Sequence, residues 1–451
     1  MGEGILSFSQ ELLLHGEIIR GRAPIVSRLV RIAGKLDLTA FASAAQGVVA
    51  VHEPLRSVCV WRDGQPLSKA LGPADLGSSF WYNRVTSLDE AKVALGQAYS
   101  PAAYSAARAP KMLNSIVRVH RDEHLWAFGV HHIAADAVSM RLYGETFSQH
   151  YSGSPTDIAT STSLDYAQRQ RNWLLTAEAQ AMYEWWMQRI EAVVPERAPV
   201  RMSAPSARPG HHRLELRIGI GIGGRNAVFK RARQWRVPPS AIFYGAFALT
   251  AAARHPSTTV SILTNLPGRS LNGASIATGA FYNTVPLIIR VKGREQHAVA
   301  LAATEALFEA LEHQELPIAL VNYSRTRARQ SQLHTLIPLS FNVVDHPLAS
   351  FRISGCRVQE IDVGTLNAPR WGRAHAALGE PAEPAIENLD WLVTVQPDAI
   401  IIGAEFDSGI WDTDDVWSML EEYGRQLGLC LGENAGDTCG DPSLIVDWRN
   451  P

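Results

Sequence analysis

Two adjacent histidines followed by an aspartate form the pattern with the clearest chemistry in this 451-residue chain. The segment reads His131-His132-Ile-Ala-Ala-Asp136-Ala137 and follows the apolar run 125–130. An imidazole has a pKa near ~6.5 in water, so a histidine at the end of a buried strand can act as a general base near neutral pH. Asp136 can hold the following turn rigid or pair with an arginine from elsewhere in the chain. The alternative interpretation is two buried structural histidines and a helix-capping carboxylate, because short motifs also occur by chance.

The elements around this segment alternate between strand and helix patterns. The run 125–130 has the length and continuous apolar character of a buried strand, and residues 137–151 repeat apolar positions at helical spacing. The same spacing predicts helices over 38–51 and 165–193. Proline and small residues then remove the periodicity over 194–210, which indicates a linker.

The second half of the chain repeats the alternation of strands and helices. We expect strands at 212–218, 258–263, 283–291, 336–344, 391–395 and 399–406, and helices at 226–236, 240–254, 296–313 and from Asp414 onward. Residues 364–388 lack a period and predict a long loop. The sequence therefore predicts an α/β protein with domains 1–196 and 197–451.

Composition excludes several classes of protein. Hydrophobic residues make up 46% of the chain and charged residues 19%, the opposite of the balance in disordered chains. The net charge of -2 argues against wholesale nucleic-acid binding. The four cysteines form no CxxC pair and the scattered histidines show no ligand spacing, so we expect no metal site. With no long apolar run and no basic leader, we expect a cytoplasmic protein outside the membrane.

Further segments resemble the nonribosomal peptide synthetase condensation domain family, which belongs to the chloramphenicol-acetyltransferase-like superfamily. The family's active-site motif is HHxxxDG, and other family segments follow in the family's order. They are Leu6–Leu13 with its Ser-x-x-Gln-x-x-Leu pattern, His52–Arg56 (HExLR), Asp165–Ala167 (DYA), Thr264–Arg269, Gly279–Leu287 (GxFxNTxPL), Gln314–Pro317 and Ser340–Asn342. The chain departs from the family pattern in lacking the usual Arg and Trp of the opening motif and in displacing the Trp after DYA.

This resemblance implies two chloramphenicol-acetyltransferase-like lobes arranged as a V-shaped pseudodimer with a central tunnel. A donor acyl thioester would arrive on the phosphopantetheine arm of an acyl or peptidyl carrier protein, and an amine or alcohol acceptor, free or carrier-bound, would enter from the other side. No bound cofactor is implied. Because nothing in the chain resembles an adenylation or carrier domain, we expect a free-standing, monomeric condensation enzyme that acts in trans in nonribosomal peptide or hybrid natural-product biosynthesis, including antibiotics.

The resemblance also implies roles for individual residues. His132 would be the general base or would position the acceptor, while His131 and Asp136 would be largely structural. Arg269 would pair with Asp136 across the tunnel. The resemblance further suggests tunnel-lining positions, namely Phe281, Asn283, Ser340 and Asn342.

Ala137 stands where the family motif usually has glycine. Its methyl group would narrow the space beside the site, which would tune substrate choice or weaken activity. Two alternatives stay open: a coenzyme A-dependent O-acyltransferase of the same superfamily, and a catalytically weak module that docks a carrier protein, which Ala137 favours. Local basic clusters would suit an acidic carrier protein, although a solvated helix face is the simpler explanation for the first of them; they include Arg225, Arg231, Arg325 and Arg327.

Overall fold

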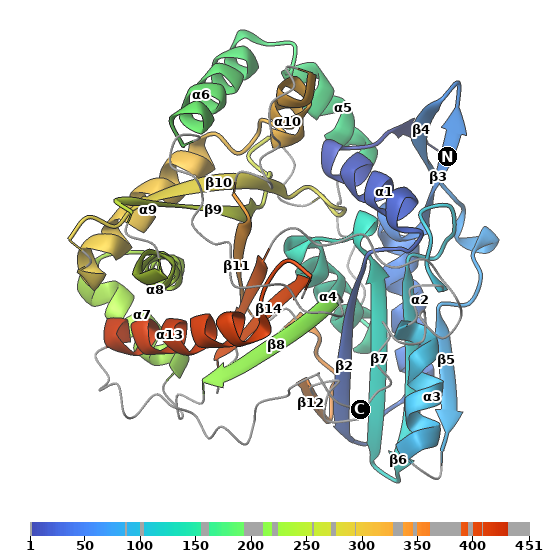
Figure 1. The fold of residues 1–451 in the computed structure, drawn as a ribbon. Helices are drawn as coiled ribbons and strands as arrows, with labels where there is room; N and C mark the ends of the chain where they lie inside the picture. The colour runs from blue at the N-terminus through green and yellow to red at the C-terminus, as the bar shows by residue number, and fades with distance from the viewer. Residues whose placement is uncertain are drawn as a thin grey trace. The chain divides into compact units, whose positions relative to one another are not determined.

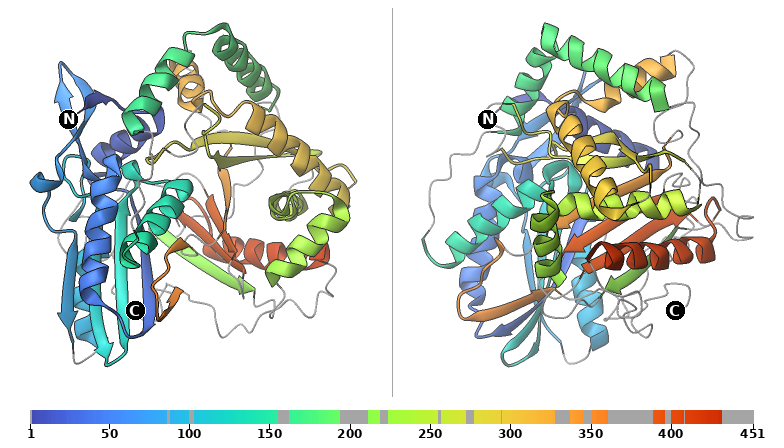
Figure 2. Two further views of the ribbon diagram at one scale, coloured as in Figure 1. Left: turned by 180° about the vertical axis from the view of Figure 1, so that it is seen from behind. Right: turned by 90° about the vertical axis from the view of Figure 1, so that its left-hand side faces the viewer.

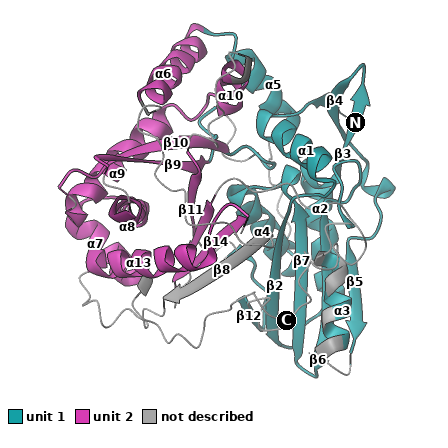
Figure 3. Cartoon of the chain, viewed as in Figure 1, with its two compact units in different colours: residues 1–176, 267–282, 347–381 teal, residues 177–266, 283–346, 382–451 magenta. Residues whose placement is uncertain are grey.

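The chain folds into two compact units, drawn in different colours in Figure 3. Unit 1 contains residues 1–176, 267–282 and 347–381, and unit 2 contains the remainder. The division expected after residue 196 therefore lies after Thr176 instead, and two later segments return to the first unit. The reason is that these segments form strand pairs and hydrogen bonds with unit 1, as described below.

The computed structural model describes most of both units. The expected linker at 194–210 and the expected loop at 364–388 lie outside the described residues. The described ranges are 2–85, 88–99, 103–154, 162–193, 211–218, 224–254, 257–271, 277–293, 295–327, 337–345, 350–360, 389–395, 400–407 and 409–431.

A five-stranded sheet of order β12-β2-β7-β6-β5 forms the centre of unit 1 (Figure 1). Its strands are β2 (Ile25–Gly34), β5 (Phe80–Arg84), β6 (Met112–His120), β7 (Glu123–His131) and β12 (Cys356–Glu360). β12 comes from the last segment of unit 1 and pairs antiparallel with β2; Figure 2 shows this orange strand beside the blue one. A smaller sheet has the order β1-β4-β3 and consists of β1 (Glu3–Ile5), β4 (Gln65–Ala70) and β3 (Ser57–Arg62).

The sequence of β7 is apolar throughout because both faces of this strand are covered. Trp126, Phe128 and Val130 belong to the large core beneath two helices, whereas Leu125 and Ala127 belong to a separate cluster beneath a third. Successive side chains of a strand point to opposite faces, so a strand covered on both faces needs a continuous apolar run. The helices of unit 1 are α1 (Phe8–Arg20), α2 (Leu38–Val51), α3 (Leu88–Tyr99), α4 (Ala137–Tyr151) and α5 (Ser163–Trp173), of which α2 and α4 cover the large core and α3 the small cluster.

A break at residues 174–176 divides the helical tract that the sequence predicts as one helix. α5 ends at Trp173 and α6 (Ala177–Val193) begins after this short turn, which is also where unit 2 begins. Apolar residues continue at helical spacing through the break, so their pattern alone does not reveal it.

Unit 2 is built on a six-stranded sheet of order β10-β9-β11-β13-β14-β8. Its core includes an aromatic cluster of Phe247, Phe341, Trp391 and Tyr423, with ring centroids 4.4 to 6.2 Å apart. The strands are β8 (His211–Ile218), β9 (Thr259–Leu266), β10 (Asn283–Arg290), β11 (Leu339–Asp345), β13 (Leu389–Val395) and β14 (Ile400–Asp407). The helices are α6, α7 (Gly224–Trp235), α8 (Pro239–Arg254), α9 (Gln296–Glu312), α10 (Ile318–Arg327) and α13 (Thr413–Leu431). No helix in the described part of the chain is long and apolar enough to cross a membrane.

His52 is a fully buried histidine that links α4 to the segment 277–282 in unit 1. Its Nε2 lies 2.8 Å from Thr146 Oγ1, whose hydroxyl donates to the carbonyl of Leu142, so Nε2 is the donor. Its Nδ1 lies 3.4 Å from Thr278 Oγ1. Burial lowers the pKa of His52 to about 4, and the charge of His150 acts in the same direction. The folded protein therefore holds this imidazole neutral.

Replacing His52 is expected to flatten the dependence of stability on pH. Below pH 6.5 the unfolded chain takes up a proton at residue 52 before the folded chain does, so stability falls as the pH drops from 6.5 toward 4. Between pH 7 and pH 5, urea unfolding should show that wild-type protein loses about 2 kcal/mol more than His52→Gln. His15→Gln, on the exposed face of α1, is the control and should follow wild type. Equal losses in wild type and His52→Gln would contradict this expectation.

Candidate active site

The two histidines and the aspartate lie on the turn between β7 and α4. β7 ends at His131, a single 3-10 turn covers His132–Ala134, and Asp136 caps α4. Ser139 sits in the first turn of α4 and donates its N–H to Asp136 Oδ1 at 2.8 Å. The sequence folds this way because Asp136 adopts the extended backbone of a helix cap, and its carboxylate satisfies an N–H that would otherwise lack a partner.

The two ring nitrogens of His132 differ in their surroundings. The residue is half-buried, and its Nδ1 is buried without a hydrogen-bond partner among the described residues. Nε2 is therefore the remaining ring nitrogen of His132. The ring lies against Tyr282, with centroids 5.4 Å apart. Burial lowers the pKa of His132, although nearby backbone groups and the charge of Asp136 act in the opposite direction, so the imidazole is neutral at pH 7 and able to accept a proton.

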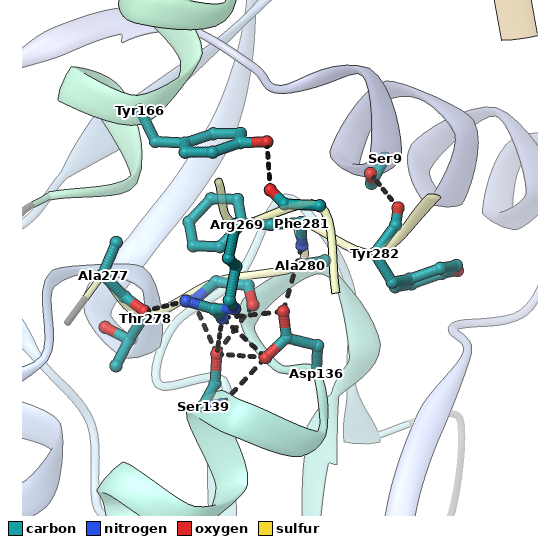
Figure 4. Close-up of polar contacts among 12 residues, drawn as sticks. Ser9, Asp136, Ser139, Tyr166, Arg269, Ala277, Thr278, Ala280, Phe281 and Tyr282 are labelled. Atoms are coloured by element: carbon teal, nitrogen blue, oxygen red, sulfur yellow. Dashed lines mark hydrogen bonds and ion pairs between the residues drawn. The ribbon is translucent and has the colours of Figure 1, made fainter. Parts of the chain in front are cut away.

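Asp136 forms a buried ion pair with Arg269, shown in Figure 4. Nη2 of Arg269 lies 2.7 Å from both carboxylate oxygens, and each side chain is only 7% exposed. Ser139 Oγ lies 2.8 Å from Asp136 Oδ1 and 3.1 Å from the same Nη2. Asp136 is thus committed to structural contacts with Arg269 and with the first turn of α4.

The same cluster attaches residues 267–282 to α4. Arg269 Nη1 donates to the carbonyl of Ala277 at 2.6 Å, and the N–H of Phe281 donates to Asp136 Oδ2 at 3.3 Å. Ser139 Oγ lies 2.8 Å from the carbonyl oxygen of Gly279. Figure 4 shows these contacts together with the Tyr166 hydroxyl on the carbonyl of Gly268. The pair implied by the resemblance is present, and both of its members belong to unit 1.

Comparison with known proteins decides the family. A profile of the condensation domain family matches residues 3–359. The chain belongs to the condensation domain family. Bacitracin synthase 3 of Bacillus licheniformis is 25% identical over 292 residues, which cover 63% of this chain and 4% of that protein. The chain therefore corresponds to only a small part of this much longer relative.

Solved structures of condensation domains share the fold. The condensation domain from Monacolin K polyketide synthase MokA matches with a TM-score of 0.76 at 17% identity, over 96% of this chain and 98% of that one. SgcC5 from Streptomyces globisporus matches with a TM-score of 0.71 at 16% identity, over 95% and 98%. At these identities the likeness shows the fold alone. The two α/β units are those of the chloramphenicol-acetyltransferase-like fold of condensation domains.

Two of the residues expected to line the tunnel make close contacts within the protein. Phe281 is 1% exposed; its ring lies 4.1 Å from that of Tyr166 and beneath the Arg269 guanidinium. These contacts place the ring in the core of unit 1, and a tunnel-lining role for Phe281 stays a prediction.

The side-chain amide of Asn283 forms its hydrogen bonds within the protein. Its Nδ2 donates to the carbonyls of Gln314 at 2.9 Å and Leu316 at 2.5 Å, and its Oδ1 accepts from the N–H of Ile318 at 3.0 Å. Asn283 thus holds the connection between α9 and α10 at the start of β10, instead of presenting its amide to a substrate.

Ser340 and Asn342 lie on β11 of unit 2. Asn342 Oδ1 accepts from the N–H of Asn265 at 2.8 Å and lies 3.4 Å from Thr264 Oγ1, while Ser340 is buried. These contacts connect β11 to β9. A tunnel-lining role for the two residues stays a prediction.

The expected docking arginines have different surroundings. Arg325 is 3% exposed, and its assignment to a carrier-docking surface stays a prediction. Arg231 is half-buried: it donates to the carbonyl of Leu431 at 2.8 Å and lies over the Trp235 ring, which makes it a support for the end of α13. The side chains of Arg225 and Arg327 lie outside the described residues. Exposed cations that remain on α7 are Lys230 and Arg233.

Sequence reasoning missed the polar residues that support the turn. Ser139 follows Asp136 by three residues, the spacing at which a helix cap meets its first free N–H. Glu17 accepts a hydrogen bond from His131 at 2.8 Å, and it shares one face of α1 with the buried residues Gln10 and Leu14. A carboxylate on the buried stripe of an amphipathic helix is the signal that could have identified it. In the described part of the chain, no three His, Cys, Asp or Glu residues are grouped to hold a metal ion.

Removal of Arg269 should destabilise the protein strongly. In Arg269→Met the Asp136 carboxylate would stay buried without its cation, which costs about 3–5 kcal/mol in other proteins. Arg141→Met, which breaks the exposed pair with Glu145 on the same helix α4, should cost below about 0.5 kcal/mol. Urea unfolding of both variants measures the difference. Similar losses in the two variants would show that the buried pair is not a main support of unit 1.

Proposed function

We propose that this condensation domain transfers an acyl or aminoacyl group from the phosphopantetheine thioester of a carrier protein to an amine or alcohol. The observation that carries the proposal is the state of the His132 imidazole. It is neutral and partly exposed, and it lies on the turn between β7 and α4, whose backbone is hydrogen-bonded to neighbouring residues. His132 serves as the general base or positions the acceptor for attack. The protein binds no cofactor for this step, since the phosphopantetheine belongs to the partner's substrate.

The chemistry needs one base and two aligned substrates. His132 Nε2 accepts the proton of the acceptor amine or hydroxyl as its nitrogen or oxygen attacks the thioester carbonyl. The carbon–sulfur bond then breaks, and the proton passes to the departing thiolate, which gives an amide or ester and a free thiol. A thioester is already activated toward attack, so alignment together with general base catalysis accounts for the acceleration.

The relatives support a role in nonribosomal peptide or related biosynthesis. Bacitracin synthase 3 is by its name a synthase of bacitracin, and the SgcC5 structure is a complex with a naphthyl ethanediol and sucrose, whose hydroxyl groups support the inclusion of alcohols among the acceptors. We propose that the donor is carried by an acyl or peptidyl carrier protein and that the domain works in the cytoplasm as a monomer.

The acyl-transfer assay described below also tests two other functions. A coenzyme A-dependent O-acyltransferase would use the same base with a soluble thioester. A docking module would bind the loaded carrier without turnover, and Ala137 is the feature that favours it.

The decisive experiment is an acyl-transfer assay with intact-mass detection. A carrier protein loaded with its acyl group, or the matching acyl coenzyme A, is mixed with amine and alcohol acceptors. Wild-type protein should unload the carrier, and His132→Ala should do so about 100-fold or more slowly, the usual loss when a general base is removed. His120→Ala, exposed at the end of β6, is the matched control and should keep wild-type activity.

Each of the three other results would contradict the proposal in a different way. Equal rates for wild type and His132→Ala would overturn the proposed base. Transfer from acyl coenzyme A but not from the carrier would establish the O-acyltransferase. Tight binding of the loaded carrier with no transfer by either protein would establish the docking module.

Ala137 is expected to tune the choice of acceptor. It is the first residue of α4 and is exposed, and its helical backbone does not require glycine. Ala137→Gly should therefore raise kcat/KM for bulky acceptors about ten-fold relative to small ones, the scale at which one methyl group discriminates in a pocket. Competition assays with paired acceptors measure this ratio. Ala177→Gly, at the exposed first position of α6, is the control, and an unchanged ratio in Ala137→Gly would exclude a tuning role.

A further inference from the structure

His131 uses both ring nitrogens in a way that defines where its proton lies. The side chain is completely buried, and its Nδ1 accepts the N–H of Ile133 at 3.1 Å. A backbone N–H can only donate, so Nδ1 carries no hydrogen and Nε2 must carry it. Nε2 faces Glu17 Oε2 at 2.8 Å, where a carboxylate can only accept. The two partners therefore select one neutral tautomer of His131.

Glu17 is itself fixed in place on α1. Its two oxygens accept the N–H of Ala106 at 3.0 and 3.1 Å. The buried Lys111 ammonium donates to the carbonyl of Ala106 at 2.7 Å, which holds the same loop from the other side. Burial by itself would raise the pKa of Glu17, but the hydrogen bonds from His131 and Ala106 outweigh it and lower the pKa. Glu17 is thus a carboxylate at neutral pH.

The turn that carries His132 is held from α1 at two points. Gln10 Nε2 donates to the carbonyl of Ile133 at 3.2 Å, and the N–H of Ile133 is bound by the ring that Glu17 orients. Both backbone groups of the residue after His132 are therefore fixed by side chains that α1 supplies or orients. Gln10 is also part of the capping box that begins α1, so the support is continuous with the start of the helix.

We propose that Glu17 is a positioning residue that keeps His131 in the Nε2–H tautomer and thereby holds the turn that carries His132. Without Glu17, the Nδ1–H tautomer would place two hydrogens against each other at Ile133 and release its N–H. The turn would then loosen beside the reacting nitrogen, and small misplacements of a reacting group reduce rates steeply. The inference deepens the proposed function and rests on it for the effect on rate, but the tautomer can be tested independently.

The first measurement is the nitrogen NMR spectrum of wild-type protein labelled at histidine, with His131→Gln used to assign the signal. His131 should show a protonated Nε2 and an unprotonated Nδ1 at neutral pH. A protonated Nδ1 in the wild-type spectrum would overturn the proposal, whatever any variant does.

The second measurement separates positioning from general stability. Glu17→Ala should populate both tautomers and reduce kcat for acyl transfer about ten-fold to 100-fold with little change in KM, whereas Glu17→Gln keeps an acceptor oxygen and should stay within about three-fold of wild type. Glu11→Ala, which removes a different carboxylate of α1, is the matched control. Wild-type kcat in Glu17→Ala, or an unchanged His131 spectrum in that variant, would overturn the proposal.

A failure of the proposed function would look different. If His132→Ala kept full activity, the base assignment would fail while the His131 spectrum still reported on Glu17. If Glu17→Ala proved unstable, the wild-type spectrum and the kcat of Glu17→Gln would still decide the inference.

Discussion

The buried ion pair of Asp136 and Arg269 is the constraint on which the rest of the site depends. Two charges with so little exposure lose most of their hydration, and their mutual attraction offsets that cost only when the remaining hydrogen-bonding positions are filled. Ser139 and the backbone of the segment 277–281 fill them. The position of that segment and the start of α4 are therefore fixed together, and His132 lies four residues before the carboxylate.

Burial acts alike on the three histidines around this turn, yet their positions give them different tasks. It lowers the pKa of His52, His131 and His132, so each is neutral in the folded protein. His52 and His131 use both nitrogens within the protein, whereas His132 keeps Nε2 free of such bonds among the described residues. Accessibility, more than acidity, distinguishes the histidine proposed to react from those that support it.

Local patterns in the sequence predicted the elements that carry the site. The apolar run before His131 and the helical spacing after Asp136 correspond to β7 and α4, because one strand face and one helix stripe dominate those segments. The partner of Asp136 was predicted only from the resemblance to the condensation domain family, since 133 residues separate it from Arg269 and no local pattern connects them.

Other features depend on packing that only the folded chain reveals. Phe281 and Arg325 lie in motifs or clusters that suggested contact with substrate or partner, but both are buried. The break between α5 and α6 is hidden by apolar residues that continue through it, and the support from Glu17 depends on which face of α1 turns inward. Tertiary contacts decide these features, and of them only Glu17 has a local signal in the sequence, its place on the buried stripe of α1.

The three-segment make-up of unit 1 sets an order for events during synthesis. When the first 176 residues have left the ribosome, the carboxylate of Asp136 still lacks the guanidinium that neutralises it, and β2 still lacks its edge partner β12. Most of unit 2 must be translated before β12 appears, so the nascent N-terminal half cannot finish folding by itself ahead of the rest. Domains of many proteins fold one after another as they emerge, but here unit 1 is complete only after part of unit 2 has been synthesised, because residues 267–282 and β12 both follow segments of unit 2 in the chain.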